Sequence, residues 1–160
     1  MNLLFSLLFT ASHFFASAEM PMHANVVAHV LIDNYHNDLY AEIYLEKTLF
    51  ANALRHEADC DASLMLSKCG SEYVEKNLKM TLNGESVVFA DQTMDIQKDY
   101  VIYRFYLGKA EDCITKVTVK TNYMFQYDEH AVTKLRIKID EVEKHYSLIT
   151  SRKEITFSKI

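Results

Sequence analysis

The stretch NVVAHVLIDNYHNDLYAEIYLE, residues 25–46, decides the fold. Apolar side chains occupy every second position on both sides of the polar segment 34–38. Successive side chains of a β-strand point to opposite faces, so each apolar set can line one side of a core. The first set is Val26, Ala28, Val30 and Ile32, and the second is Leu39, Ala41, Ile43 and Leu45. The polar turn between them predicts an antiparallel hairpin.

The same alternation returns in the second half of the chain. Asn83 and Gly84 readily adopt positive φ in a tight turn, so LKMTLNGESVVF (78–89) predicts a second hairpin. In VTKLRIKI (132–139), the leucine and isoleucines alternate with basic side chains on the opposite face. Further short strands are predicted in YVIYRFYL (100–107), CITKVTVKTNYMF (113–125), HYSLIT (145–150) and EITFSKI (154–160).

Residues 47–77 have a helical period instead. In KTLFANALRHEA the apolar residues recur at helical spacing, with Thr48 as a candidate N-cap. CDASLMLSKCG predicts a short second helix ending at Gly70, because glycine favours the left-handed backbone that ends many helices. SEYVEKNL predicts one or two further helical turns that begin at Ser71.

These patterns predict a mainly β fold, namely an antiparallel immunoglobulin-like β-sandwich with a short helical insertion at about residues 47–77. A β-barrel is the alternative, because alternation alone does not distinguish the two. The 160 residues, of which 49% are hydrophobic, suit one domain with its own core. A net charge of −5 and the lack of a basic stripe exclude non-specific binding of nucleic acid, which needs clustered Lys and Arg.

The first 18 residues, MNLLFSLLFTASHFFASA, have the pattern of a signal peptide. Their apolar run is shorter than the roughly 20 residues that span a bilayer, and it ends in Ala16-Ser17-Ala18, the small-x-small pattern that signal peptidase recognises. Met1 and Asn2, which precede the apolar run, supply no Lys or Arg, which is unusual for a signal peptide, and an uncleaved anchor is the alternative. We expect cleavage to leave residues 19–160 as a single exported domain, periplasmic or secreted, with no membrane span.

The three cysteines suggest one disulfide in an oxidising compartment. Cys60 and Cys69 are close enough in sequence to close a short loop, which leaves Cys113 over. The alternative is three buried thiols, because free cysteine packs as a small hydrophobic residue.

The start of the exported chain carries candidate metal ligands. Met20, Met22 and His23 lie together, and His29 follows on the first predicted strand. Thioether and imidazole ligands suit copper, so a periplasmic copper- or zinc-binding protein is an alternative function. However, His23 is fifth in the exported chain, too far along for the terminal-amine copper motif. A loose N-terminus with scattered surface histidines is therefore the preferred interpretation.

The chain has ten tyrosines and no tryptophan. Tyr40, Tyr44, Tyr100 and Tyr106 fall on predicted outward faces of strands, and tyrosine is enriched at recognition surfaces. If these side chains lie side by side, they form a platform for a protein or glycan partner. The alternative is that strands simply favour tyrosine.

Catalytic motifs are absent from the sequence. It has no G-x-S-x-G elbow, no glycine loop for phosphate and no H-E-x-x-H. Asp128, Glu129 and His130 are adjacent and could act as an acid and base, but such clusters are typical of solvated turns. The leading hypothesis is therefore a non-catalytic binding or accessory protein of unknown partner, without a cofactor.

Two segments, LYAEIYLEKTLFANAL and YVEKNLKMTLNGESVVF, resemble a family of small exported proteins of Gram-negative bacteria that is known only as a domain of unknown function. The matching positions are His23, Leu39, Leu45, Tyr73, Leu78, Asn83 and Gly84. The chain departs from the family pattern in FQYDEHAVTKL, where His130 and Ala131 replace an expected Gln-x-Asn segment. The resemblance implies export and an all-β core, and it implies no activity.

Overall fold

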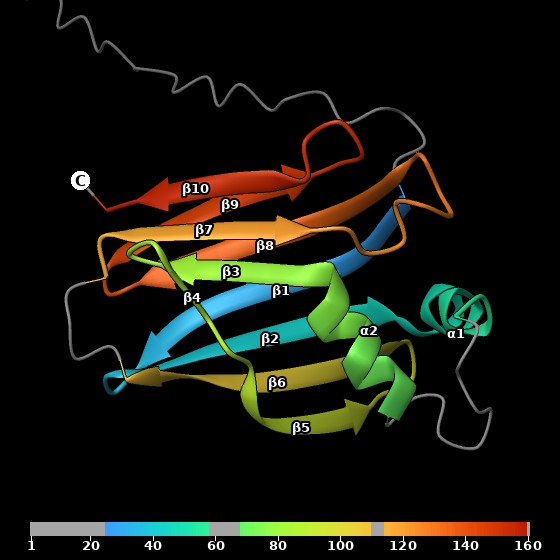
Figure 1. The fold of residues 1–160 in the computed structure, drawn as a ribbon, viewed down its shortest axis with the longest axis horizontal. Coiled ribbons are helices and arrows are strands. Elements are labelled where there is room, and N and C mark those ends of the chain that lie inside the picture. Colours follow the sequence, from blue (N-terminus) through green and yellow to red (C-terminus); the bar gives the residue numbers. More distant parts are fainter. Residues whose placement is uncertain (1–24, 58–67, 110–113, 160) are drawn as a thin grey trace, which may run out of the picture.

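The computed structural model describes residues 25–57, 68–109 and 114–159. In these residues, ten strands form two sheets that lie face to face, and two helices lie at one end of them (Figure 1). The strands are β1 (Asn25–Tyr35), β2 (Asp38–Glu46), β3 (Leu78–Leu82), β4 (Glu85–Ser86), β5 (Ala90–Ile96), β6 (Tyr100–Lys109), β7 (Lys116–Thr121), β8 (Ala131–Ile139), β9 (Val142–Leu148) and β10 (Glu154–Ser158). The helices are α1 (Lys47–Arg55) and α2 (Gly70–Asn77).

Both sheets are open, so the predicted β-sandwich is confirmed over its alternative. The larger sheet has the order β5-β6-β2-β1-β8-β9, and the smaller has the order β10-β7-β3-β4. Both predicted hairpins form, since β1 pairs antiparallel with β2 and β3 with β4. The second turn has the predicted positive φ angles at Asn83 and Gly84, and the first turn has them at His36 and Asn37, which was not predicted.

Two features of the sheets were not predicted. β1 pairs with β8 in parallel, although the other ladders are antiparallel. A parallel pair joins strands far apart in the chain and leaves no turn signal in the sequence. β5 was missed because ADQTMDI is a mostly polar strand at the edge of the larger sheet, and its described side chains are nearly all exposed, so no apolar alternation marks it.

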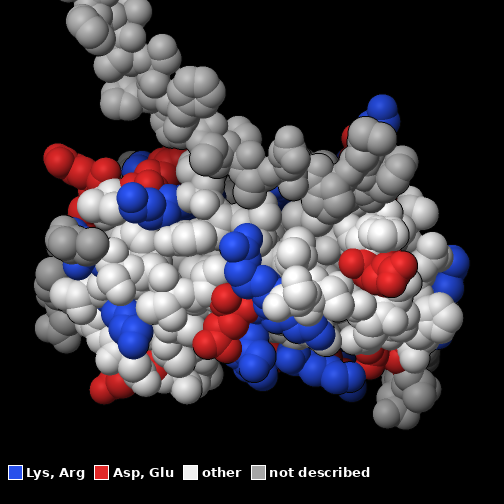
Figure 2. Space-filling view, turned by 90° about the horizontal axis from the view of Figure 1, so that it is seen from above, with Lys and Arg blue, Asp and Glu red and all other residues white. Residues whose placement is uncertain are grey.

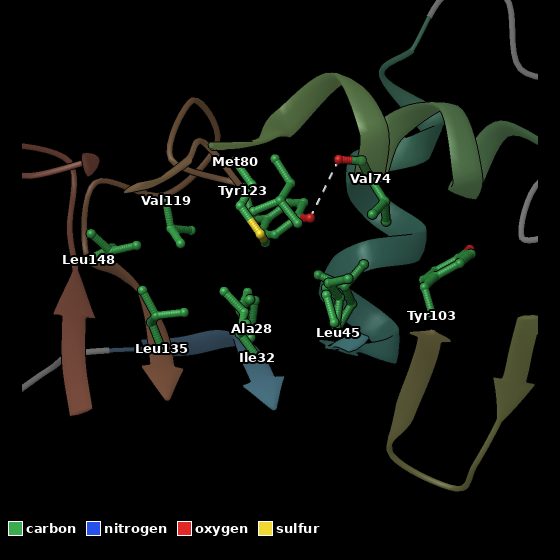
Figure 3. Packing of buried hydrophobic residues seen from close by; sticks show 14 of the residues in the cluster. Ala28, Ile32, Leu45, Val74, Met80, Tyr103, Val119, Tyr123, Leu135 and Leu148 are labelled. Carbon is green, nitrogen blue, oxygen red and sulfur yellow. Dashed lines mark hydrogen bonds between the residues drawn. The ribbon is translucent and has the colours of Figure 1, made fainter. Parts of the chain in front are cut away.

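The core lies between the inner faces of the two sheets. In Figure 3, Ala28 and Leu135 of the larger sheet point toward Met80 and Val119 of the smaller one. Tyr123 is fully buried among them and donates a hydrogen bond of 3.4 Å to the backbone carbonyl of Val74 (Figure 3). Burial raises the pKa of its phenol well above the usual value of 10.0, so Tyr123 stays neutral and structural.

The helices cover the part of the core near β2 and β6 (Figure 1). Phe50 of α1 meets both Tyr73 of α2 and Tyr103 of β6 edge-on, with ring centroids 5.6 and 6.0 Å apart. Gly70 lies so close to this cluster that a Cβ atom there would be 1.9 Å from the Tyr103 hydroxyl oxygen. α2 can therefore approach β6 only because its first residue has no side chain.

The helical insertion is confirmed, because α1 begins at Lys47 and α2 ends at Asn77, but the residues predicted to cap or end its helices are wrong. Glu46 caps α1 instead of Thr48, because its carboxylate accepts hydrogen bonds from the backbone N–H groups of Thr48 and Leu49, at 3.1 and 2.6 Å. Gly70 begins α2 rather than ending a helix, since the close contact with Tyr103 selects glycine there. Ser71 lies inside α2, and Cys69 precedes it as the N-cap residue.

Among the described residues, no helix has the length and hydrophobicity that crossing a membrane requires.

Candidate functional site

The outer face of the larger sheet, which points away from the smaller sheet, carries most of the candidate residues. The two helices direct their buried residues into the core on the opposite, inner side. Residues of β1, β2, β6 and β8 mostly alternate between buried inner positions and partly exposed outer ones, although Ile102 is buried opposite Tyr44 on the outer face. The outer positions are mostly aromatic or charged, so this face is a largely polar surface.

The four predicted tyrosines lie on this face in two pairs. Tyr40 of β2 is opposite Tyr106 of β6, with ring centroids 5.6 Å apart. Tyr44 of β2 and Tyr100 of β6 meet edge-on at 6.4 Å. The side-by-side arrangement that a platform requires is therefore present, because β2 and β6 are neighbours and share one register. We call these four residues the tyrosine platform.

A partly exposed ion pair, Glu42 with Arg104, lies between the two tyrosine pairs. The Glu42 carboxylate accepts hydrogen bonds from Arg104 Nε and from the Tyr44 hydroxyl, each at 2.7 Å. Partial burial raises the pKa of Glu42, but these hydrogen bonds outweigh it, so the pKa lies below the usual 4.5. The carboxylate therefore stays ionised and is a weak proton acceptor. This chemistry suits recognition better than acid–base catalysis.

His29 lies next to the platform on β1. Its ring is edge-on to Tyr100 at 6.2 Å, and its neighbours across the sheet are Tyr44 and Lys134. Burial and, less strongly, the Lys134 cation lower the pKa of His29, so the ring is neutral at pH 7.

The other three candidate metal ligands, Met20, Met22 and His23, lie outside the described residues, so the structure does not bring the set together. Within residues 25–57, 68–109 and 114–159, no cluster of three or more His, Cys, Asp or Glu side chains could hold a metal ion. The metal site stays a prediction.

β8 adds a row of three cations on the other side of β1. Lys134, Arg136 and Lys138 occupy successive outer positions. Arg136 Nη2 and Lys138 Nζ lie 3.9 and 4.0 Å from the Asp33 carboxylate, which are long distances for ion pairs. Arg136 Nε is buried and has no hydrogen-bond partner among the described residues. The side chain is still 36% exposed, so the Nη groups of Arg136, rather than its Nε, can take a further acceptor.

Basic and acidic side chains are otherwise intermingled on the surface. Figure 2 shows Lys and Arg next to Asp and Glu over the side of the molecule seen from above, rather than a broad area of one sign. Across the sheet, the acidic neighbours of the row on β8 are Asp33 of β1 and Glu143 of β9, both beside Lys138.

Cys69 is disulfide-bonded. The other two cysteines, Cys60 and Cys113, lie outside the described residues, so the predicted Cys60–Cys69 pair stays a prediction.

The acidic turn before β8 has a structural use. One carboxylate oxygen of Asp128 accepts a hydrogen bond from the Asn25 side chain at 2.9 Å, and the other accepts from the His130 backbone N–H at 2.8 Å. Glu129 and His130 are exposed, and their side chains are 3.6 Å apart. Asp128 thus fixes the start of β1 against the start of β8, and its oxygens are already engaged.

A shallow groove on the smaller sheet was not predicted. It has a volume of about 540 Å³ and lies between β3 and the segment 86–89, which continues from β4. Lys79, Thr81, Thr118 and Lys120 form its floor, and the highly exposed Val88 lies at its wall. No sequence signal marked it, because a groove between a strand and a departing segment depends on tertiary packing.

Comparison with protein-family models finds no match, and comparison with curated proteins finds no similar sequence. The family resemblance seen in the sequence therefore stays a prediction. A proposal about function has to start from the geometry of the outer face.

Proposed function

We propose that the protein is an exported, non-catalytic binding or accessory protein that recognises a partner, protein or glycan, through the tyrosine platform. The observation that carries this proposal is the meeting of four tyrosines from two neighbouring strands on one half-exposed face. Tyrosine offers a large apolar ring with a polar tip and loses little conformational freedom on binding. An aromatic platform on paired strands is therefore preorganised for contact.

The arrangement around the platform favours binding over reaction. Arg104 and the Tyr44 hydroxyl hold Glu42 as a carboxylate with a lowered pKa. Tyr106 donates a hydrogen bond of 3.2 Å to Asp38, which fixes its ring over β2. Each of these groups orients a neighbour. Arg and Tyr are also the residues that most often dominate binding energy at protein interfaces.

Export is supported by two features of the chain. The first 18 residues end in the small-x-small pattern of a signal-peptidase site. Cys69 is disulfide-bonded, and disulfides persist mainly in oxidising compartments. Mass spectrometry of the protein from a periplasmic fraction should give the mass of residues 19–160. An intact N-terminus would remove the basis for cleavage after Ala18.

Photo-cross-linking in cells tests the platform. A photoreactive phenylalanine at position 40 should form a discrete cross-linked product with a protein partner. The same residue at position 127 is the matched control, because Tyr40 and Tyr127 are 39% and 43% exposed and Tyr127 lies away from the platform against His56. In parallel, the purified protein is tested on a glycan array, where the pair Tyr40→Ser and Tyr106→Ser should abolish any specific signal.

The proposal fails if position 40 gives no product beyond that of position 127 and the array shows no signal that depends on the two tyrosines. A glycan signal without a cross-link identifies the partner as a glycan, and a cross-link without a glycan signal identifies it as a protein.

A periplasmic copper- or zinc-binding function stays the alternative prediction. Calorimetric titration with Cu(I), Cu(II) and Zn(II) should give weaker binding for a chain with Met20, Met22 and His23 replaced by Ala. Equal affinity of the two proteins would exclude the N-terminal ligands.

A further inference from the structure

We infer that the partner of the outer face is a second copy of this chain, packed face to face about a two-fold axis that runs along β1 above Leu31. This inference rests on the proposed function, because it names the occupant of the face that carries the tyrosine platform. It follows from the way the sheet register arranges charge on the two sides of β1.

The register gives three rows across β2, β1 and β8. In the middle row, Leu31 lies between Glu42 of β2 and Arg136 of β8. In the second row, His29 lies between Tyr44 and Lys134, and in the third row Asp33 lies between Tyr40 and Lys138. Each row therefore has a cation on the β8 side and a carboxylate or an aromatic ring on the β2 side.

A two-fold axis along β1 exchanges these two sides between the copies. In such a contact the same patch serves both subunits, so every pair occurs twice. Arg136 of one copy then faces Glu42 of the other, and the lysines of β8 face tyrosine rings of β2. Arg binds carboxylates through a matched fork, and ammonium groups are attracted to tyrosine faces. Face-packed sheets also align within about 30°, as this axis requires.

The groups nearest the axis are compatible with the arrangement. Leu31 meets its own copy, which gives the contact an apolar centre. His29 also meets its own copy, and the ring is neutral because burial and the nearby Lys134 lower its pKa. Asp33 would meet a second carboxylate, but Arg136 and Lys138 lie 3.9 and 4.0 Å from it and offset its charge.

The state of Arg136 gives an independent reason for a partner. Its Nε is buried without an acceptor among the described residues, and its Nη2 is 3.9 Å from Asp33. The buried Nε cannot reach a second copy, but the Arg136 side chain is 36% exposed, so its Nη groups can. A facing carboxylate, such as Glu42 of the second copy, would give these Nη groups a closer acceptor than Asp33.

The size of the face indicates how strong the contact is. Six strands about 4.8 Å apart, each contributing roughly seven residues at about 3.3 Å, give roughly 600 Å² per copy. The total of about 1,200 Å² is at the lower end of specific interfaces. We therefore expect a dimer that dissociates on dilution, and the test needs a wide concentration range.

Sedimentation equilibrium of the exported chain, from about 1 to about 500 µM, should show a monomer–dimer equilibrium. Arg136→Glu alone and Glu42→Arg alone should each raise the dissociation constant about tenfold or more, because like charges then face each other twice. The double variant with both changes should restore dimerisation, because the exchanged charges attract again. Urea unfolding of each variant confirms that it is folded.

A cysteine at the axis gives a second readout. Leu31→Cys should form a disulfide between the two copies under mild oxidation, detected as a 31–31 cross-linked peptide by mass spectrometry. Thr118→Cys is the matched control, because Thr118 occupies an outward position on a central strand of the smaller sheet. It should form no such peptide.

The inference is overturned by a chain that is monomeric throughout the range, by a dimer that both single charge variants leave intact, or by equal cross-linking at positions 31 and 118. The photo-cross-linking and the glycan array separate this failure from failure of the proposed function. If the chain is monomeric but cross-links to another protein through position 40, or binds a glycan through the tyrosine platform, the inference of a second copy is refuted and the proposed function stands.

Discussion

The contact between Gly70 and Tyr103 makes a sharp prediction about how α2 is held against β6. A Cβ atom on Gly70 would lie 1.9 Å from the Tyr103 hydroxyl oxygen, 3.1 Å from its Cζ and 3.2 Å from Cζ of Phe50. Tyr103 is completely buried, so its hydroxyl cannot swing into solvent. Gly70→Ala must therefore displace the Tyr103 ring within a packed core.

The expected cost follows from two opposing effects. Overpacking of a core by one methyl group destabilises by about 1–3 kcal/mol. Alanine is a better helix former than glycine by up to about 1 kcal/mol, which offsets part of this cost. We expect Gly70→Ala to lower the free energy of unfolding by about 1–2 kcal/mol.

A double-mutant cycle isolates the contact. Tyr103→Phe removes the oxygen at 1.9 Å and leaves neighbours at 3.1 and 3.2 Å, which are tight but tolerable. In that background Gly70→Ala should cost close to nothing, so the coupling free energy should be about 1–2 kcal/mol. Tyr106→Phe is the control, because Tyr106 is on the same strand but on the outer face. There the cost of Gly70→Ala should be unchanged.

Urea unfolding followed by circular dichroism provides the measurement, and equal m-values confirm that only stability has changed. The reasoning is refuted if Gly70→Ala is harmless in the original chain, or if it costs as much with Phe as with Tyr at position 103.

Three further predictions concern hydrogen bonds of the sandwich. The pKa of Glu42 is lowered in the folded state, so its contribution to stability is present above its usual pKa of 4.5 and is lost as the pH falls through the lower folded value. The urea concentration at the unfolding midpoint should therefore fall less between pH 7 and pH 3 for Glu42→Gln than for the original chain. Parallel pH curves of the two proteins would contradict this. The Asn34 side chain donates a hydrogen bond to the Asp140 carboxylate and accepts one from the Asp140 backbone N–H, both at 2.8 Å. Asn34→Ala should therefore destabilise the protein by about 1–3 kcal/mol in thermal or urea unfolding, and an unchanged free energy of unfolding would contradict this. The Tyr73 hydroxyl accepts a hydrogen bond from the backbone N–H of the buried Met124 at 2.9 Å. Tyr73→Phe should therefore lower the free energy of unfolding by about 1–3 kcal/mol and speed amide hydrogen exchange at Met124. Unchanged exchange at Met124 would show that the bond is dispensable.

The strands of this fold were predictable where the chain itself carries a local signal. The alternation of Leu39, Ala41 and Ile43, and the Asn83–Gly84 turn, mark elements that the structure contains. The prediction for Gly70 was wrong, because glycine is favoured both at the end of a helix and at a close contact with a tyrosine ring, and the sequence does not distinguish the two roles. That choice depends on Tyr103, which is distant in sequence and whose position cannot be read from it.

The candidate site divides in the same way. The outward direction of Tyr40 and Tyr106 follows from a period of two, so their exposure was predictable. Their pairing depends on β6 lying beside β2 in one register, which the sequence does not encode locally. The partner-free Nε of Arg136 and the groove beside residues 86–89 likewise depend on packing, and no pattern in the sequence marked them.

The parallel pairing of β1 with β8 has a consequence for the order in which the protein folds. β1 begins the described chain, yet its second neighbour follows about a hundred residues later, as the bond between Asn25 and Asp128, 103 positions apart, illustrates. Closing so long a loop is slow, so we expect the hairpin of β1 and β2 to form before β8 pairs with β1. Until then, one side of β1 has no partner strand. During that interval the open backbone of β1 is a template for pairing with other chains. A ribosome-stalled or truncated chain that ends before β8 should therefore aggregate, and the complete protein depends on its last third to protect its first strand.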